Sequence, residues 1–174
     1  MHTNVSPFSS KPPAKIELRP IQKQIKEIIK KGQNGRKVNV IVDPKGGAGK
    51  TTLSKELLIH GLEEKGDTFV CTNGKSADLA YAYNGEKNVI INLARSNNER
   101  ENYQIFEQFI DGLVMSSKYE SCVKLTKDVS LTIMTNYPMD YDKMSLDRWQ
   151  VWETQGDFLV PQEIPQEDCS SSDE

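Results

Sequence analysis

The segment that most constrains this chain runs from Ile41 to Leu53 and reads IVDPKGGAGKTTL. A β-branched stretch at 37–43 leads into it, and leucines at helical spacing follow from Thr51. Glycines let backbone N–H groups approach an anion closely, and a helix that begins with lysine and threonine adds a positive charge and a hydroxyl. A strand, a glycine-rich turn and a helix in this order predict a phosphate-binding loop.

The roles expected within this loop follow the general pattern G-x-x-x-x-G-K-[ST]. Pro44 stands at the first glycine position, whereas KGGAGKT fits the remainder. Lys50 is expected to contact the β- and γ-phosphates of ATP, and the Thr51 hydroxyl to hold Mg²⁺. The predicted nucleotide-binding residues are Gly46, Gly47, Ala48, Gly49, Lys50, Thr51 and Thr52. A plain glycine-rich turn is the alternative.

A second family of phosphate-binding loops also matches the string KGGAGKTT. In ParA/MinD-like partition ATPases an extra lysine, here Lys45, reaches across a dimer. That family is expected to carry an aspartate-rich D-x-D-P after its second strand, whereas this chain has FVCTNGKSAD there. The partition interpretation is therefore disfavoured.

Helices and strands are expected to alternate along the chain. Periodic apolar residues predict helices at 20–31, 51–64, 76–83 and 105–113, the second with Leu53, Leu57, Leu58 and Leu62 inward. Short apolar or β-branched runs predict strands at 37–43, 67–72, 88–94, 130–136 and 148–154. The alternation predicts an α/β P-loop NTPase fold with a central parallel sheet flanked by helices.

Composition divides the chain into one domain and two tails. Residues 1–17 are expected to be a flexible lead-in, 18–154 the ATPase domain, and 155–174 an acidic disordered tail. No apolar run reaches the ~20 residues of a membrane span, and no signal-peptide h-region is present, so we expect an intracellular protein in the nucleus or cytoplasm. Residues 1–50 carry eleven Lys/Arg against three acids, a balance that fits either contact with phosphates or a solvated helix face.

From about Leu18 to Glu153 the chain carries six motifs in a characteristic order: LRPIQKQI, DPKGGAGKTTL, GKSADLAYAYNGEKNVIINLARS, NYQIFEQFIDGLVMSSKYES, LTIMTNYPMD and MSLDRW. In this order they resemble the superfamily 3 helicase domain of replication-associated (Rep) proteins of circular single-stranded DNA viruses and plasmids. They look like its opening segment, Walker A, the run into Walker B, the B′ region, motif C and the arginine-finger segment. The 2C-like RNA helicases share this domain type, so RNA is the neighbouring alternative as substrate.

The resemblance implies an AAA+-like, ATP-hydrolysing ring, typically a hexamer, that translocates on single-stranded DNA. It implies that Asn136 is sensor 1 and that Arg148 is the finger given to the nucleotide of the neighbouring subunit. It also implies that Lys118 and Tyr119 lie in a loop that contacts DNA phosphates. The alternatives are a turn residue for Asn136, a surface ion pair for Arg148 and an ordinary exposed lysine for Lys118.

The chain departs from this family at Walker B. Asn92 stands where the family has an aspartate that organises Mg²⁺ and its waters. An asparagine can accept a hydrogen bond from a Mg²⁺-bound water but supplies no charge, so nucleotide binding is expected to survive better than turnover, with losses of ~10²-fold or more. Glu99 is a candidate substitute. Two hypotheses remain: an ATP-dependent helicase domain, or a nucleotide- and nucleic-acid-binding module with weakened catalysis.

Rep proteins also begin with a nicking endonuclease domain that carries a His-apolar-His metal pair and a catalytic tyrosine. Only His2 and His60 occur in this chain, and they are unpaired. We therefore expect these 174 residues to lack the nickase.

Overall fold

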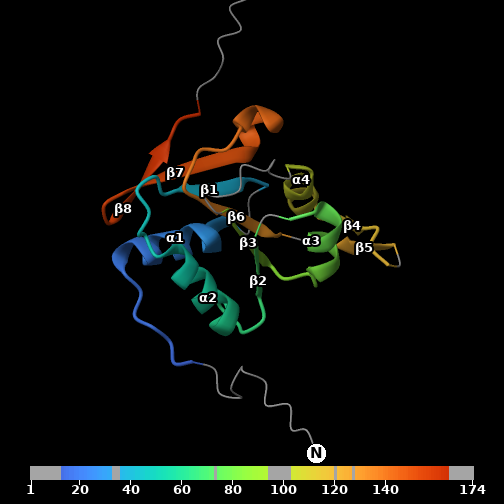
Figure 1. Ribbon diagram of the computed structural model, residues 1–174, viewed down its shortest axis with the longest axis horizontal. Coiled ribbons are helices and arrows are strands. Elements are labelled where there is room, and N and C mark those ends of the chain that lie inside the picture. The colour runs from blue at the N-terminus through green and yellow to red at the C-terminus, as the bar shows by residue number, and fades with distance from the viewer. Residues whose placement is uncertain are drawn as a thin grey trace, which may run out of the picture.

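The fold is an α/β sandwich around one central sheet (Figure 1). The computed structural model describes residues 13–32, 36–72, 74–93, 103–119, 121–126 and 128–164. The elements follow in the order α1 (Pro20–Lys31), β1 (Val38–Val42), α2 (Lys50–His60), β2 (Thr68–Thr72), α3 (Ser76–Ala82), β3 (Asn88–Asn92), α4 (Tyr103–Asp111), β4 (Leu113–Ser116), β5 (Cys122–Leu125), β6 (Ser130–Thr135), β7 (Trp149–Gln155) and β8 (Phe158–Gln162).

The sheet has six strands in the order β2-β3-β6-β1-β7-β8. The first five run parallel, and β8 pairs antiparallel with β7 at the edge. Strand β6 lies between β1 and β3, in a register that pairs Val42 with Thr135 and Asn92 with Met134. The carboxyl ends of the parallel strands β1, β3 and β6 therefore lie side by side. This carboxyl edge of the sheet, which is distinct from the edge strand β8, is where open α/β sheets bind their ligands.

Both faces of the sheet are covered, which explains the continuous apolar runs of its central strands. Helices α1 and α2 pack on the face that carries Ile41, Ile90 and Met134. Helices α3 and α4 pack on the other face. They contact the strand residues that are next to Ile41, Ile90 and Met134 in sequence and point the opposite way. The predicted fold class is confirmed.

Helix α2 departs from the prediction at its end. It stops at His60 because the Asp67 carboxylate accepts hydrogen bonds from the next backbone N–H groups, those of Leu62, Glu63 and Glu64. Leu53, Leu57 and Leu62 are buried as expected, but Leu58 is exposed. The prediction for Leu58 is wrong because the residue after Leu57 lies about 100° further around the helix.

Two strand pairings were not predicted. Strands β4 and β5 form a separate antiparallel hairpin, which Figure 1 shows beside α3 and away from α1 and α2. Residues 155–164, expected to be disordered, instead end β7 and form β8. The Gln24 side chain of α1 holds β8 by donating to the carbonyl of Asp157 and accepting from the N–H of Leu159. Residues 165–174 lie outside the described part of the chain, as do residues 1–12.

Among the described residues, no helix combines the length and apolar character that crossing a membrane requires.

Candidate nucleotide-binding site

The loop between β1 and α2 has the conformation that its glycines predict. Gly46, Gly47 and Gly49 have φ angles of 76°, 83° and 79°. Residues with a side chain rarely adopt this left-handed backbone, so the loop depends on glycine at these positions. Gly49 is also the N-cap of α2, and Lys50 and Thr51 open that helix. The loop thus ends at a helix N-terminus, where backbone N–H groups without helical partners favour an anion.

A buried carboxylate, Asp43, stands directly before this loop. Its side chain is 3% exposed and accepts hydrogen bonds from Lys50 Nζ at 2.8 Å, the Ala48 N–H at 3.1 Å and Thr154 Oγ1 at 2.6 Å. Burial alone would raise the pKa of Asp43, but these hydrogen bonds and the charge of Lys50 outweigh burial and hold the pKa below its ordinary value. Lys50, the predicted phosphate ligand, is therefore presented to the site by an internal counter-ion.

Sequence reasoning missed both Asp43 and Thr154. The aspartate next to Pro44, where a phosphate-binding loop has no required acid, was the available signal. No local sequence pattern pointed to Thr154, because strand β7 brings it to the loop from 111 residues away in sequence.

The predicted sensor, Asn136, follows β6 and lies against the same loop. Its Nδ2 donates to the backbone carbonyl of Asp43 at 2.9 Å, and the Asp43 N–H donates to the Thr135 carbonyl at 2.9 Å. Two bonds therefore tie the end of β6 to the start of the loop. The Asn136 side chain also lines the cavity described below, so it is placed to contact a ligand there.

Asn92, the Walker B position, is tied to the first turn of α2. Its Nδ2 donates to Ser54 Oγ at 3.0 Å, and Ser54 Oγ donates to the Lys50 carbonyl at 2.9 Å. Asn92 therefore presents a neutral amide to the cavity, and Ser54 links it to the helix that carries Lys50. Glu99, the candidate substitute for the missing acid, lies outside the described residues.

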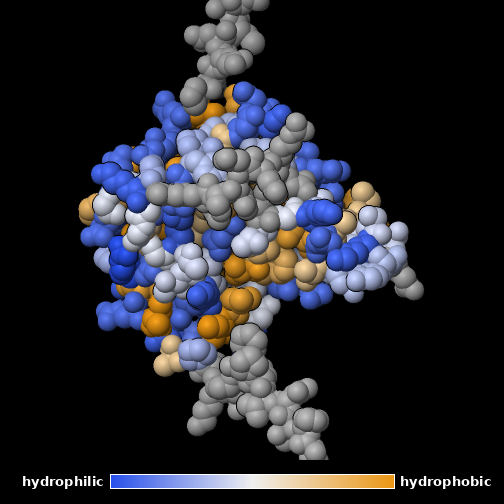
Figure 2. Space-filling view, in the orientation of Figure 1, coloured by the Kyte–Doolittle hydropathy of each residue, from blue (hydrophilic) through white to orange (hydrophobic). Residues whose placement is uncertain are grey.

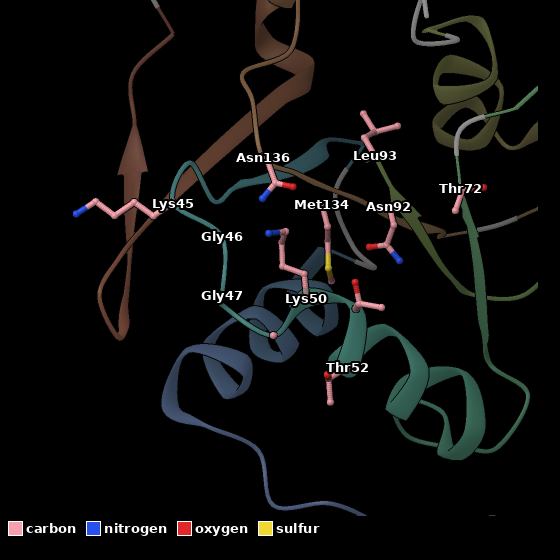
Figure 3. A pocket seen from close by; sticks show the side chains of 12 residues that line it. Lys45, Gly46, Gly47, Lys50, Thr52, Thr72, Asn92, Leu93, Met134 and Asn136 are labelled. Carbon is pink, nitrogen blue, oxygen red and sulfur yellow. The ribbon is translucent and has the colours of Figure 1, made fainter. Parts of the chain in front are cut away.

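A cavity of about 580 Å³ opens between the loop and the strand ends. Figure 3 shows the Lys50 side chain pointing into the cavity, with Asn136 above it in this view. Asn92 lies on the far side of Met134 from Lys50, and the Lys45 side chain points away from the cavity. The residues that line it come from the loop, the start of α2 and the ends of β2, β3 and β6: Lys45, Gly46, Gly47, Gly49, Lys50, Thr51, Thr52, Thr72, Asn92, Leu93, Met134 and Asn136. The structure thus brings together all but Ala48 of the predicted nucleotide residues as cavity lining, and Ala48 lies within the same loop.

The cavity fits a nucleotide better than it fits a free metal ion. Its loop offers a lysine, a helix N-terminus and the hydroxyls of Thr51 and Thr52, which suit phosphate oxygens. None of the described lining residues carries a carboxylate. In the described part of the chain, no three or more His, Cys, Asp or Glu side chains cluster to hold a metal ion. Mg²⁺ would therefore depend on phosphate oxygens for most of its charge compensation.

Helix α1 supports the loop from behind, which sequence reasoning also missed. Buried Gln22 donates from Nε2 to the Gly49 carbonyl at 3.1 Å, and Arg19 Nη1 donates to the Gly47 carbonyl at 2.8 Å. A Cβ at Gly49 would lie 2.5 Å from Gln22 Nε2, so the contact is tight. The available signal was that Gln22 lies next to Ile21 on the apolar stripe of α1. A glutamine at such a position is expected to be buried, and a buried amide needs a hydrogen-bond partner.

Comparison with known proteins places this loop and these strands in one family. A family model described as RNA helicase matches residues 40–137, which run from β1 through the end of β6. The chain belongs to the RNA helicase family. The resemblance expected from the motifs is thereby confirmed.

Proteins similar to this RNA helicase domain occur in viruses and in their satellites. The master replication protein of Faba bean necrotic yellows virus is 33% identical over 116 residues, which cover 67% of this chain and 39% of the relative. The corresponding protein of Subterranean clover stunt virus is 34% identical over 113 residues, 65% of this chain and 38% of the relative. Para-Rep C1 of the Faba bean necrotic yellows C1 alphasatellite is 32% identical over 137 residues, which cover 77% of this chain and 47% of the relative. The chain spans less than half the length of these relatives.

The remaining predicted site residues of the helicase domain lie outside the cavity. Arg148 Nη1 pairs with Asp111 Oδ1 at 2.9 Å, which links the segment before β7 to the end of α4. Lys118 Nζ pairs with Asp78 Oδ1 at 2.8 Å, and Tyr119 is exposed at the turn of the β4–β5 hairpin. The structure therefore does not bring these three residues to the nucleotide site within one chain.

Proposed function

We propose that this chain is the motor domain of a viral-type replication protein, which binds and hydrolyses ATP to move along single-stranded DNA. The observation that carries the proposal is the cavity at the carboxyl edge of the sheet, where the loop, Lys50 and Asn136 converge. The replication proteins that share the family support DNA as the substrate, and the family description supports RNA as the alternative.

In this proposal the residues of the loop bind and orient the nucleotide. Lys50 exchanges its partner Asp43 for the β- and γ-phosphates, and the loop N–H groups and the hydroxyl of Thr51 hold phosphate and Mg²⁺. Bound Mg²⁺ supplies the positive charge that compensates the phosphoryl group during transfer. Asn136 is placed to orient the attacking water or contact the γ-phosphate, while its bond to Asp43 couples β6 to the loop.

Asn92 sets the expected rate. Its amide would accept a hydrogen bond from a water on Mg²⁺ but would contribute no charge, so ATP would bind while turnover would be slow. This neutral amide also favours the second candidate function, a nucleotide- and nucleic-acid-binding module with little turnover. The two functions differ in rate rather than in the identity of the site.

Self-association is part of the proposal. In a ring, the hexamer that the family suggests, Arg148 would stabilise charge on the nucleotide of the neighbouring subunit. Within one chain it is held by Asp111, so the pair must open when Arg148 takes that role.

The decisive experiment is Mg²⁺-dependent ATP hydrolysis by the purified chain, with and without single-stranded DNA or RNA, beside Lys50→Ala. Turnover that nucleic acid stimulates and Lys50→Ala abolishes is expected of a motor domain. ATP binding without turnover above the Lys50→Ala background would replace the motor with the binding module. If the chain neither hydrolyses nor binds ATP, both the motor domain and the binding module are rejected.

A further inference from the structure

Asp43 carries its negative charge inside the protein, directly before the phosphate-binding loop. Figure 2 shows hydrophilic residues spread over the outer surface in this view, whereas the Asp43 side chain is 3% exposed. The general pattern of a phosphate-binding loop requires no acid at this position. A buried carboxylate is costly unless hydrogen bonds and an opposite charge compensate it, so its presence beside an anion-binding loop is unexpected.

The Asp43 carboxylate uses the same kinds of donor that bind a phosphate group. Its Oδ2 accepts hydrogen bonds from Lys50 Nζ at 2.8 Å and from the Ala48 N–H at 3.1 Å. The first donor is the ammonium group expected to contact the β- and γ-phosphates, and the second is a backbone N–H of the loop itself. Of the described loop residues 45–52, Ala48 is the one that does not line the cavity, and it is 6% exposed. Toward the loop, the carboxylate is therefore an internal anion.

Strand β7 holds the other oxygen of this carboxylate. Strands β1 and β7 pair up to Val42 and Glu153, so the next residues, Asp43 and Thr154, lie side by side. Thr154 Oγ1 donates to Asp43 Oδ1 at 2.6 Å. The hydroxyl and the loop N–H satisfy hydrogen bonds of the carboxylate but leave its charge, and Lys50 is the cation that pairs with it.

A bound nucleotide and Asp43 therefore need the same ammonium group. If Lys50 moves to a phosphate, the buried carboxylate is left with two neutral donors and no cation, which is unfavourable. A hydrogen bond between charged groups changes an equilibrium constant by about tenfold or more. The exchange should weaken nucleotide binding by a factor of that order. The same free energy favours departure of the nucleotide, because Lys50 then returns to Asp43.

We infer that Asp43 is an internal competitor for Lys50, which weakens nucleotide binding and speeds the release of ADP, and that Thr154 sets the strength of this competition. The inference deepens the proposed function, because it rests on nucleotide binding at this site, although it does not require turnover. Asp43 is a positioning residue in this role. It acts through Lys50 and does not line the cavity itself.

The test measures binding of fluorescent analogues of ADP and of a non-hydrolysable ATP to the full chain with Mg²⁺. Fluorescence anisotropy gives the Kd, and stopped-flow displacement gives the dissociation rate. Asp43→Asn keeps the size of the side chain and removes its charge, so it should lower both Kd values by about tenfold and slow the dissociation of ADP.

Thr154→Val is expected to act in the opposite direction. It leaves the carboxylate more dependent on Lys50, so it should raise both Kd values about threefold, whereas Thr154→Ser, which keeps the hydroxyl, should not. Adding Thr154→Val to Asp43→Asn should leave the affinity of Asp43→Asn within about twofold, because the threonine acts through the carboxylate.

A loss of stability alone would not produce this pattern. Asp43→Asn and Thr154→Val both disturb buried hydrogen bonds, yet they should move the affinity in opposite directions. Asp67→Asn is the matched control, because it removes a carboxylate that accepts backbone N–H bonds just beyond the end of α2. It should leave nucleotide affinity within about twofold. Equal or weaker ADP binding in Asp43→Asn would overturn the competition, and equal affinity in Thr154→Val would overturn the role of Thr154.

The inference and the proposed function fail in different ways. Tighter binding in Asp43→Asn, with wild-type turnover no higher than in Lys50→Ala, would reject the motor and support the competition. Turnover that nucleic acid stimulates, with unchanged affinity in Asp43→Asn, would support the motor and reject the competition. If neither the wild type nor Asp43→Asn binds either nucleotide, both are rejected.

Discussion

The nucleotide site and the β4–β5 hairpin each have a lysine paired with an aspartate at the same separation. Lys50 and Asp43 are 2.8 Å apart, and so are Lys118 and Asp78. The exposed fractions of the side chains differ: 12% and 3% at the nucleotide site, 40% and 49% at the hairpin. Equal distances therefore describe pairs of very different strength, because water screens the exposed pair and not the buried one.

The two pairs also differ in the surroundings of their charged groups. At the nucleotide site Asp43 has further partners in Ala48 and Thr154, so the pair is part of a satisfied buried network that holds the loop. At the hairpin the pair is solvated, so Lys118 can change partner at little cost. The buried pair holds the phosphate-binding loop, whereas the exposed pair contributes little to the stability of the fold.

The largest effect is expected from removing the buried carboxylate. Asp43→Ala leaves Lys50, the Ala48 N–H and Thr154 without their acceptor, so it should lower the free energy of unfolding by about 3 kcal/mol. Asp78→Ala is the matched control at the same N–O distance and should leave the unfolding midpoint nearly unchanged. Urea denaturation of both variants measures the contrast, and equal destabilisation would mean that burial does not separate the two pairs.

A second prediction concerns catalysis at the same buried site. Asn92→Asp adds the charge that the cavity lacks, so ATP turnover should rise by ~10²-fold while the Kd for ATP changes little. Steady-state hydrolysis and binding of a fluorescent ATP analogue separate the two quantities. The existing carboxylate of Asp43 cannot supply this charge, because Asp43 does not line the cavity. Unaltered turnover in Asn92→Asp would show that another residue limits the reaction.

A third, smaller effect tests how far the buried network extends. Gln22→Ala removes the bond to the Gly49 carbonyl and should weaken ATP binding about fivefold, the value of roughly one hydrogen bond. Gln24→Ala is its control on the same helix, because Gln24 bonds to β8 instead of the loop. Equal ATP affinity in the two variants would limit Gln22 to a packing role. A Gln22→Leu variant, which keeps a similar volume but has no donor, should resemble Gln22→Ala.

The smallest expected effect is the response of stability to acid. Burial would raise the pKa of Asp43, but its hydrogen bonds from Lys50, Thr154 and Ala48 outweigh that and lower it. A carboxyl group with a lowered folded pKa stabilises the fold above its unfolded pKa, near 4, and loses this contribution as the pH falls through the folded value.

Asp43→Asn should therefore show a weaker loss of stability below about pH 4 than the wild type. Urea unfolding at successive pH values measures it. Some acid sensitivity remains in the variant, because the pKa of Asp67 is lowered as well: burial raises it, and the backbone N–H groups of Glu64, Glu63 and Leu62 more than compensate. Identical pH profiles would assign the acid response to Asp67 and the other carboxyl groups.

The sequence by itself determined the parts of this protein that depend on neighbouring residues. The glycine spacing predicted the loop, apolar periodicity predicted α1 and α2, and unbroken apolar runs predicted the central strands, because each pattern reports on local backbone geometry or on one buried face. The ordered motifs predicted the family. These signals together sufficed for the α/β fold and for the positions of Lys50, Asn92 and Asn136 at one edge of the sheet.

Only the tertiary structure decided which distant residues complete the site. Thr154 reaches Asp43 and Gln22 reaches Gly49 through strand order and helix packing, across separations in sequence that no local pattern encodes. The same reason explains β8, whose pairing depends on the exposed edge of β7 and on Gln24. Burial is the last such quantity: it distinguishes Asp43 from Asp78, two aspartates whose side-chain chemistry is identical, because it depends on the packing of the whole chain.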